Sequence, residues 1–196
     1  MNEYLIHIQN QAADLGDAIE DVLDTLLSSR PEFTFWSGSH HPYAHHYGKF
    51  GLIKHTAEVI RLCFATKKVT GVSVDDGELF LAALFHDTGK LFDYEPIDST
   101  YLQWAPTSHK RLIHHISRSA LIWHDCAEKH PDVYTRYHDN VLHAILSHHE
   151  QREFGSPVAP KSKVAWLVHL CDSISARMDD ANRLDQITFA KEMDNG

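Results

Sequence analysis

The sequence is poor in cysteine and contains no long hydrophobic run, and each shortage excludes a class of protein. No apolar segment reaches the roughly 18 residues that a membrane-spanning helix needs, so we expect no membrane span. The first residues lack the basic and apolar segments of a signal peptide, which favours a cytoplasmic protein. Cys63, Cys126 and Cys171 have no CxxC spacing and are typical of buried thiols in a reducing compartment.

Basic residues are also scarce. The chain has 18 Lys and Arg against 27 Asp and Glu, which gives a formal net charge of -9. A protein that holds long nucleic acid through its phosphates needs a basic stripe, and the densest basic cluster here is only Lys110, Arg111 and Arg118. We therefore expect no extended duplex as partner. A pocket for a short anionic substrate is compatible with this charge, because bound cations can reverse the local field.

Histidine, in contrast, is abundant. The 17 histidines nearly equal the 18 Lys and Arg, and many stand in adjacent pairs at 40–41, 45–46, 114–115 and 148–149. Composition alone indicates metal binding only weakly. The positions of the histidines within the helices therefore carry the argument.

Apolar residues recur at helical spacing, and the alternation typical of strands is rare, so we expect an all-α fold. The length suits a single domain over residues 1–196, with an N-terminal helix in 1–31, a core over 38–180 and a polar tail over 181–196 that carries a few apolar anchors such as Leu184, Ile187 and Phe189. Long loops are expected at 32–50, 92–107 and 151–161. The segments with helical periodicity are about 9–29, 52–67, 73–87, 109–129, 131–150 (with a break near Asp139) and 162–178.

The His86-Asp87 pair follows a run of mostly apolar residues at the expected end of the third helix. A buried carboxylate without a partner is costly, and a cation removes the cost. The cation can be a metal ion or Lys90. A simple hydrogen bond between the two side chains at the helix end is the alternative.

Two further residues favour the metal. Asp172 again ends an apolar run, and His55 shares a helix face with Val59 and Leu62. One shared ion explains why all of these polar residues stand among apolar residues, and this is simpler than a separate explanation for each residue. Nitrogen and carboxylate ligands without thiolate suit Mn²⁺, Fe²⁺, Mg²⁺, Ni²⁺ or Co²⁺, and Zn²⁺ is also compatible.

These residues resemble the H…HD…D signature of the HD superfamily of metal-dependent phosphohydrolases. His55, His86-Asp87 and Asp172 match it in order, and the segment from His86 to Lys90 is similar to its extended HDxGK form. The chain also contains a second HD dipeptide, His124-Asp125, outside this pattern. The resemblance covers about residues 38–180 and implies an HD-domain helical bundle of about six to eight helices.

The resemblance also implies roles for further residues. Some HD enzymes hold two metal ions, and His115 and His148 resemble the extra ligands, although their neighbours His114 and His149 are alternatives. Asp87 would bind metal and orient the nucleophile. Lys90 would contact the phosphate, unless it is an ordinary solvated loop residue. The other candidate substrate contacts are Arg118, Arg152 and Arg177, together with His114 and His149.

The segment 148–157, Asp172 and the segment 176–178 are similar to the HD domain of OB–HD 3′→5′ exoribonucleases. The segments 40–43 and 51–56 resemble the region around the first ligand of these enzymes and also that of HD-type conjugative relaxases. We therefore expect a metal-dependent phosphohydrolase, with one or two divalent ions, acting on a phosphoester of a nucleotide or a short RNA or DNA end. A catalytically silent, metal-binding regulatory or nucleotide-binding module is the alternative, and metal storage is a third reading. Whether the chain forms a homo-oligomer stays open.

Overall fold

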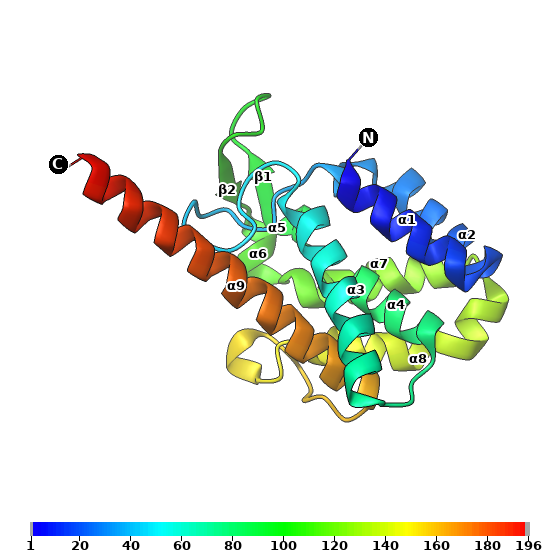
Figure 1. Cartoon of the computed structure of the whole chain (residues 1–196). Helices are drawn as coiled ribbons and strands as arrows, with labels where there is room; N and C mark the ends of the chain where they lie inside the picture. The colour runs from blue at the N-terminus through cyan, green and yellow to red at the C-terminus, as the bar shows by residue number, and fades with distance from the viewer. Residues whose placement is uncertain (1, 195–196) are drawn as a thin grey trace.

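The computed structural model describes residues 2–194, and the side chains are described up to residue 185 (Figure 1). Helices dominate, and one small hairpin of two strands stands at the edge of the helical body. The elements in chain order are α1 (Glu3–Leu15), α2 (Asp17–Ser29), the 3₁₀ turn η1 (Pro31–Thr34), α3 (Gly51–Thr70), α4 (Asp76–Phe85), α5 (Lys90–Asp93), β1 (Tyr94–Pro96), β2 (Trp104–Pro106), α6 (Ser108–Leu112), α7 (His115–Ala127), α8 (Pro131–Ser147), the 3₁₀ turn η2 (Arg152–Phe154) and α9 (Lys163–Asp194).

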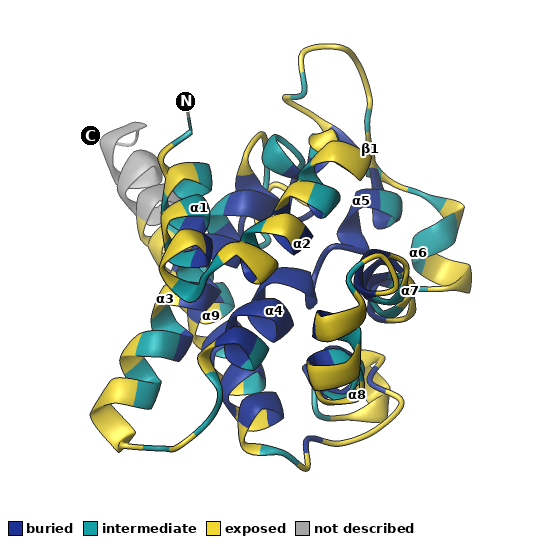
Figure 2. Ribbon diagram, turned by 90° about the vertical axis from the view of Figure 1, so that its right-hand side faces the viewer, coloured by how far each residue is buried: buried dark blue, intermediate teal, exposed yellow. Residues whose placement is uncertain are grey.

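Helix α4 lies at the centre of the fold. It begins at the cap residue Asp75, whose carboxylate accepts the N–H of Glu78, and every residue from Leu79 to Phe85 is buried. Figure 2 shows α4 in dark blue among the other helices, and it contacts α3, α7, α8 and α9. Each large apolar side chain buried in this way contributes about 1.5–3 kcal/mol. Because α4 is central, the residues that follow its C-terminal end, His86 and Asp87, also lie inside the molecule.

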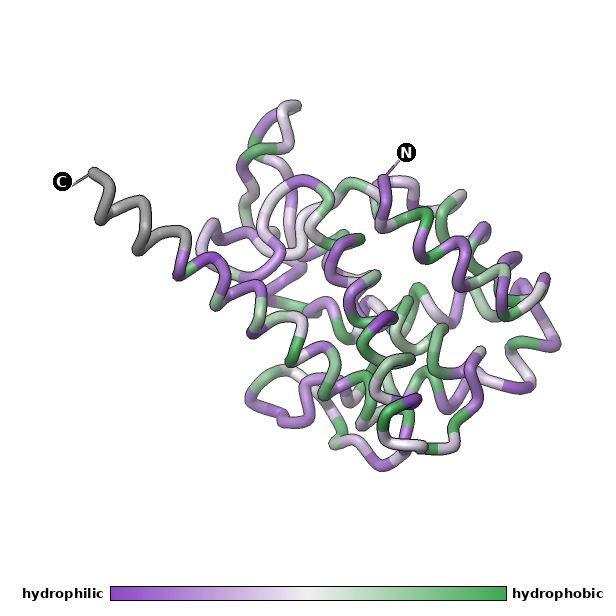
Figure 3. Tube along the Cα trace, in the orientation of Figure 1, coloured by the Kyte–Doolittle hydropathy of each residue, from purple (hydrophilic) through white to green (hydrophobic). Residues whose placement is uncertain are grey.

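The outer helices are amphipathic. Along α1 and α2 the trace alternates between hydrophilic and hydrophobic residues in Figure 3, and Ile8, Ala12, Ile19 and Val22 face the core. Helices α3 and α9 pack against each other, and α9 then continues beyond the body in Figure 1. None of the described helices is both long and apolar enough to cross a membrane.

The all-α prediction is confirmed. Within residues 2–194, seven helices have ten or more residues (α1, α2, α3, α4, α7, α8 and α9), inside the expected range of six to eight. The three cysteines are buried and free, as expected. Helix α8 runs through Asp139 without the expected break.

Two of the predicted helices are divided. The segment 9–29 belongs to α1 and α2, which are separated at Gly16, where φ is 103°. The segment 109–129 is α6 and α7, separated at His114, where φ is 71°. This turn lets the backbone N–H of His115 donate to Asp93 Oδ2 at 3.2 Å. The helix is therefore interrupted at the point where the backbone contacts Asp93 of a different segment.

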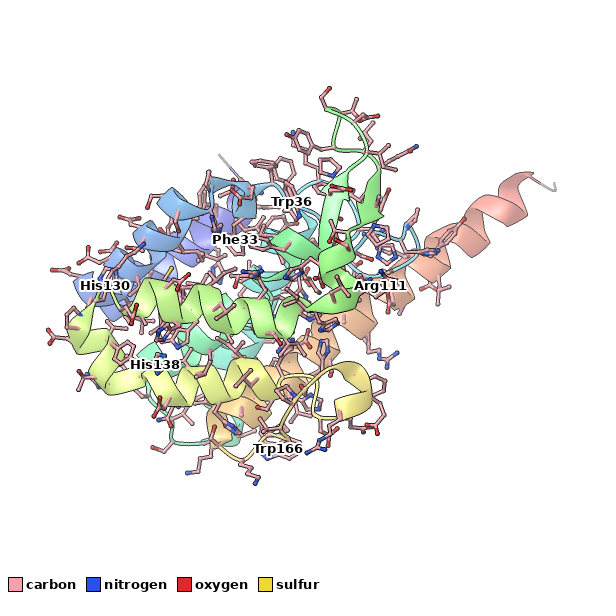
Figure 4. The ribbon with its side chains drawn as sticks, turned by 180° about the vertical axis from the view of Figure 1, so that it is seen from behind. Phe33, Trp36, Arg111, His130, His138 and Trp166 are labelled. Carbon is pink, nitrogen blue, oxygen red and sulfur yellow. The ribbon has the colours of Figure 1, made fainter. Side chains whose placement is uncertain are left out.

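The segment 92–107 was expected as a loop but contains the end of α5 and the hairpin. Strands β1 and β2 pair antiparallel with Tyr94 opposite Pro106. The Trp104 ring packs edge-on against Trp36, with ring centroids 4.8 Å apart, and Trp36 lies beside the hairpin in Figure 4. This aromatic contact anchors the hairpin to the segment before α3.

The last helix was expected to end near Met178, but α9 continues to Asp194. No glycine or proline occurs between 179 and 194, so no residue there stops the helix. Leu184 is 62% exposed on this extension. The other expected anchors, Ile187 and Phe189, lie outside the residues whose side chains are described.

Candidate metal centre

Four polar side chains from three helices meet in the interior. His55 comes from α3, His86 and Asp87 directly follow α4, and Asp172 comes from α9. One ligand atom from each residue lies within 4.8 Å of the others, and all four residues are buried. His55 Nε2 is 3.0 Å from Asp172 Oδ1, 3.2 Å from Asp87 Oδ2 and 3.2 Å from His86 Nε2. The residues predicted from the apolar runs therefore converge on one point.

Local hydrogen bonds turn the imidazoles toward this point. His86 follows the last residue of α4, and its Nδ1 donates to Ala83 O at 2.7 Å. His148 follows the last residue of α8 in the same way, and its Nδ1 donates to Ile145 O at 2.7 Å. The last carbonyls of a helix have no partner within the helix, so they are ready acceptors. Each ring is left with its Nε2 lone pair facing inward, as a metal ligand requires.

A second group adjoins the first through Asp87. Ligand atoms of His115, His148 and His149 lie within 4.8 Å of one another. Asp87 Oδ1 is 3.5 Å from His115 Nε2 and 3.7 Å from His148 Nε2. Asp87 thus stands between two clusters of ligands, one on each carboxylate oxygen.

His115 is oriented by Asp93, which ends the one-turn helix α5. Asp93 is fully buried, and its Oδ2 accepts both the ring Nδ1–H of His115 at 3.1 Å and the backbone N–H at 3.2 Å. Gly89 permits this arrangement, because a Cβ at that position would lie 2.1 Å from the carbonyl oxygen of His115. The HDxGK segment therefore passes directly beneath the start of α7.

Several buried atoms in these clusters have no hydrogen bond of normal geometry. They are both carboxylate oxygens of Asp87 and the Nε2 atoms of His115 and His148. Leaving buried polar atoms without hydrogen bonds costs free energy. With their ring protons on Nδ1, His115 and His148 have no proton on Nε2 to donate to the Asp87 carboxylate. A divalent cation satisfies all of them, so the donor set fits a metal ion.

The charges of the site follow the same pattern. Burial lowers the pKa of His86 and His115 to about 4, which keeps both rings neutral near pH 7. Burial raises the pKa of Asp172, but the hydrogen bond and charge of His55 outweigh it and lower the pKa overall. For His55 burial lowers the pKa, yet the carboxylates of Asp172 and Asp87 raise it to about 9. Neutral nitrogens and ionised carboxylates are the forms that bind metal. His86, His115 and Asp172 are therefore in the binding form near pH 7, whereas His55 is protonated and must give up a proton when a cation binds.

A cavity of about 570 Å³ opens next to the clusters. Cationic side chains line it: Lys90, whose Nζ is 2.7 Å from Asp87 Oδ2, and also Lys110 and Arg177. The remaining lining residues are Gly38, Ser39, His45, Tyr94, His114, His115, His148, His149, Glu150, Phe154, His169, Asp172, Ser173, Ala176 and Asp180.

The predicted substrate contacts divide into two groups. His114, His149 and Arg177 line the cavity. Arg118 is not among the lining residues; its Nε donates to His109 Nε2 at 3.1 Å and its guanidinium lies 4.6 Å from the centre of the Phe92 ring. Arg152 lies exposed in η2 and does not line the cavity either.

Sequence reasoning missed several residues of the site. Asp93 lies in the segment expected as loop, so no helical pattern points to it, and Lys110 stands out in the sequence only as part of a basic cluster in the expected helix 109–129. Ser175 lies three residues after Asp172 and Glu58 three residues after His55, and this helical spacing was a signal that could have found them. His45 belongs to a loop, and no periodicity points to it.

The comparison with known families agrees with this geometry. The HD domain family model matches residues 52–177, a span that includes His55, His86-Asp87 and Asp172. No solved structure matches the chain. The narrower likeness to OB–HD exoribonucleases is not confirmed. Since the matched span is well over half of the chain, the protein belongs to the HD domain family.

Proposed function

We propose that the protein is a metal-dependent phosphohydrolase that cleaves a phosphoester of a nucleotide or of a short nucleic-acid end. The observation that carries the proposal is a set of buried atoms without hydrogen bonds of normal geometry, Asp87 Oδ1 and the Nε2 atoms of His115 and His148. They lie beside a cavity with three cationic side chains. Metal ligands and phosphate-binding cations are thus adjacent.

The chain offers ligands for two divalent ions. His55, His86, Asp87 and Asp172 would hold one, and His115, His148 and His149 would hold the other with the second oxygen of Asp87. Metal ions bound there supply Lewis acidity, which lowers the pKa of water and neutralises phosphate charge.

The remaining groups position the substrate. Lys90 is buried against Asp87, and this negative charge keeps its pKa above the ordinary value despite the opposing effect of burial. A permanently charged Lys90 at the cavity wall can stabilise negative charge that develops on a phosphoryl oxygen. Lys110 and Arg177 offer further contacts for the phosphate.

The size and walls of the cavity favour a small substrate. A volume of about 570 Å³ lies within the usual range of small-molecule sites. Phe154 lines the cavity and is 61% exposed, so its ring is available to stack on a base. A nucleotide, or the terminal nucleotides of a single strand, combines an anionic group with a flat ring in the required way.

The test compares the two HD dipeptides of the chain. Tag-free wild type, Asp87→Ala and Asp125→Ala are assayed with Mn²⁺ on bis-p-nitrophenyl phosphate, on a panel of nucleotides and on short single-stranded RNA. We expect turnover by the wild type and by Asp125→Ala, and none by Asp87→Ala. Metal binding without turnover on any substrate would favour a regulatory module instead. No metal binding would contradict the proposal.

A further inference from the structure

A chain of hydrogen bonds runs from the metal centre to the outer side of helices α3 and α9. His55 Nδ1 lies 3.0 Å from Ser175 Oγ, and Ser175 Oγ donates to Glu58 Oε2 at 2.8 Å. Glu58 is one turn from His55 on α3, and Ser175 is one turn from Asp172 on α9. The chain therefore connects the two helices that carry metal ligands.

The direction of the protons follows from what each group can donate. The Glu58 carboxylate accepts only, because burial raises its pKa but the hydrogen bonds and charges of its neighbours lower it overall. The single hydroxyl proton of Ser175 therefore points to Glu58. Ser175 Oγ must then accept from His55, which fixes one ring proton on Nδ1. The proton that His55 gives up to a metal ion is therefore the one on Nε2, which faces Asp172 and Asp87.

The same oxygen of Glu58 serves a second branch. His46 Nε2 lies 2.9 Å from Glu58 Oε2 and must donate its proton to it. In the neutral ring Nδ1 is then an acceptor, and it lies 3.2 Å from His45 Nδ1, which donates. His45 is left with an unprotonated Nε2, and this ring lines the substrate cavity.

The backbone of His46 is also tightly held. Its N–H donates to Asp179 Oδ2 at 2.7 Å, and its carbonyl accepts the N–H of Gly38 at 2.9 Å. A Cβ on Gly51 would lie only 1.8 Å from that carbonyl oxygen. The loop before α3 is therefore fixed against the helices at His46, whose buried ring has little freedom to turn.

We propose that Glu58 is a positioning residue, which through Ser175 fixes the metal-binding tautomer of His55 and through His46 presents an unprotonated His45 nitrogen to the cavity. This inference rests on the proposed function, since it assigns a role toward the metal. Carboxylates and hydroxyls behind a metal-bound histidine set its tautomer and orientation, and their loss weakens metal affinity by about 10–100-fold.

Glu58 is well placed for a test by substitution. Its side chain is 32% exposed and borders an outer cavity of about 320 Å³, with Lys54 and Arg61 among its neighbours. Different residues of α9 line this cavity and the substrate cavity. Removing the carboxylate therefore opens no hole in the core. Both hydrogen bonds end on one oxygen, so Glu58→Gln, with its amide oxygen there, keeps both and loses only the charge.

The experiment is a titration of the full-length apoprotein with Co²⁺, followed by the visible absorption of the bound ion. The proteins are the wild type, Glu58→Ala, Glu58→Gln, Ser175→Ala and the control Arg61→Ala, which changes another side chain at the outer cavity. Thermal unfolding of each apoprotein is measured alongside. Long-range ¹H–¹⁵N spectra of the Zn²⁺ forms report the tautomers of His45, His46 and His55.

We expect Glu58→Ala and Ser175→Ala to bind Co²⁺ about 10–100-fold more weakly with an altered absorption spectrum. Glu58→Gln and Arg61→Ala should bind as the wild type does, and only Glu58→Ala should change the tautomer of His46. Wild-type affinity in both Glu58→Ala and Ser175→Ala would overturn the inference, and so would equal weakening in Glu58→Ala and Glu58→Gln. If the wild type binds no Co²⁺, the proposed function falls first, and this inference falls with it.

Discussion

The chain contains the dipeptide His-Asp twice, and the two copies have opposite surroundings. His86-Asp87 follows the most buried helix of the fold, and both residues are inaccessible. His124-Asp125 lies within α7, where Asp125 is exposed. His124 contacts His138 through Nδ1 at 3.0 Å and Glu128 through Nε2 at 3.3 Å. His138 is labelled on α8 in Figure 4.

The difference shows what makes a dipeptide into a site. Within a helix, neighbouring residues point about 100° apart, so His124 and Asp125 cannot face one target. After the end of α4 the chain turns, and the side chains of His86 and Asp87 approach within 3.5 Å. Both nitrogens of His124 already have partners at the surface. At the first copy, in contrast, Lys90 pairs with Asp87 Oδ2 at 2.7 Å, and buried Asp87 Oδ1 has no hydrogen bond of normal geometry.

The largest expected effect comes from replacing the histidine of the first copy, and the same replacement in the second copy is its control. His86→Ala should lose an ion from the first cluster, and a metal ion contributes several kcal/mol to the transition state, so turnover should fall by roughly 1000-fold. His124→Ala should keep wild-type turnover. Steady-state kinetics with Mn²⁺ measures both, and similar activity of the two variants would contradict the assignment of the site.

A smaller effect is expected from the second cluster. His148→Ala removes one ligand next to Asp87 but leaves the first cluster complete. We expect one fewer ion per chain and a loss of about 100-fold in turnover, because one metal still supplies part of the charge stabilisation. His138→Ala, on the same helix, is the control. Metal analysis after dialysis gives the stoichiometry, and an unchanged count in His148→Ala would argue against a second ion.

The partner of His115 should matter less than a ligand does. Both carboxylate oxygens of Asp93 accept ring protons, Oδ1 from His109 and Oδ2 from His115, so Asp93→Asn leaves one of these contacts without an acceptor, and we expect metal affinity to fall by about 10–100-fold. Asp139 makes a comparable contact to His138 at 2.8 Å, but its side chain is 97% exposed. Asp139→Asn should therefore bind Mn²⁺ like the wild type. Competition with a chelator measures both affinities.

The smallest effect concerns the pH dependence of stability. Burial raises the pKa of Asp179, but Arg183, Lys54 and the backbone N–H of His46 outweigh it and hold the pKa below its ordinary value. A lowered folded-state pKa stabilises the fold above the unfolded pKa of about 3.9, and this contribution is lost as the pH falls through the folded value.

Asp179→Asn should therefore lower the free energy of unfolding by about 1 kcal/mol at pH 7, since solvent screens part of these interactions. The difference from the wild type should shrink below about pH 4, where the unfolded carboxyl is already protonated. Urea unfolding across this range gives the two curves, with Asp125→Asn as the surface control. A difference that grows toward acid pH would have the wrong sign.

The sequence was sufficient for the helical class and for the convergence of His55, His86-Asp87 and Asp172, because buried acids at the ends of apolar runs are costly without a cation. It could not foresee the surroundings of His114 and His115, because the positive φ at His114, directly before α7, accompanies a tertiary contact to Asp93. In the structure His115 lies near His148 and His149, and His114 and His115 both lie near Asp93. At the 148–149 pair both rings enter the second cluster. The position of Asp93 depends on contacts between distant segments, which periodicity within one helix does not encode, whereas Glu58 lies one turn from His55 on the same helix.

The most direct test of a metal centre at Asp87 is a crystal structure of the wild type grown with Mn²⁺, with anomalous diffraction used to locate the ion. The expected result is an anomalous peak in contact with the Asp87 carboxylate and enclosed by His55, His86 and Asp172, with a second peak beside His115 and His148. Density without any anomalous peak at Asp87, in crystals soaked in excess Mn²⁺, would contradict the account.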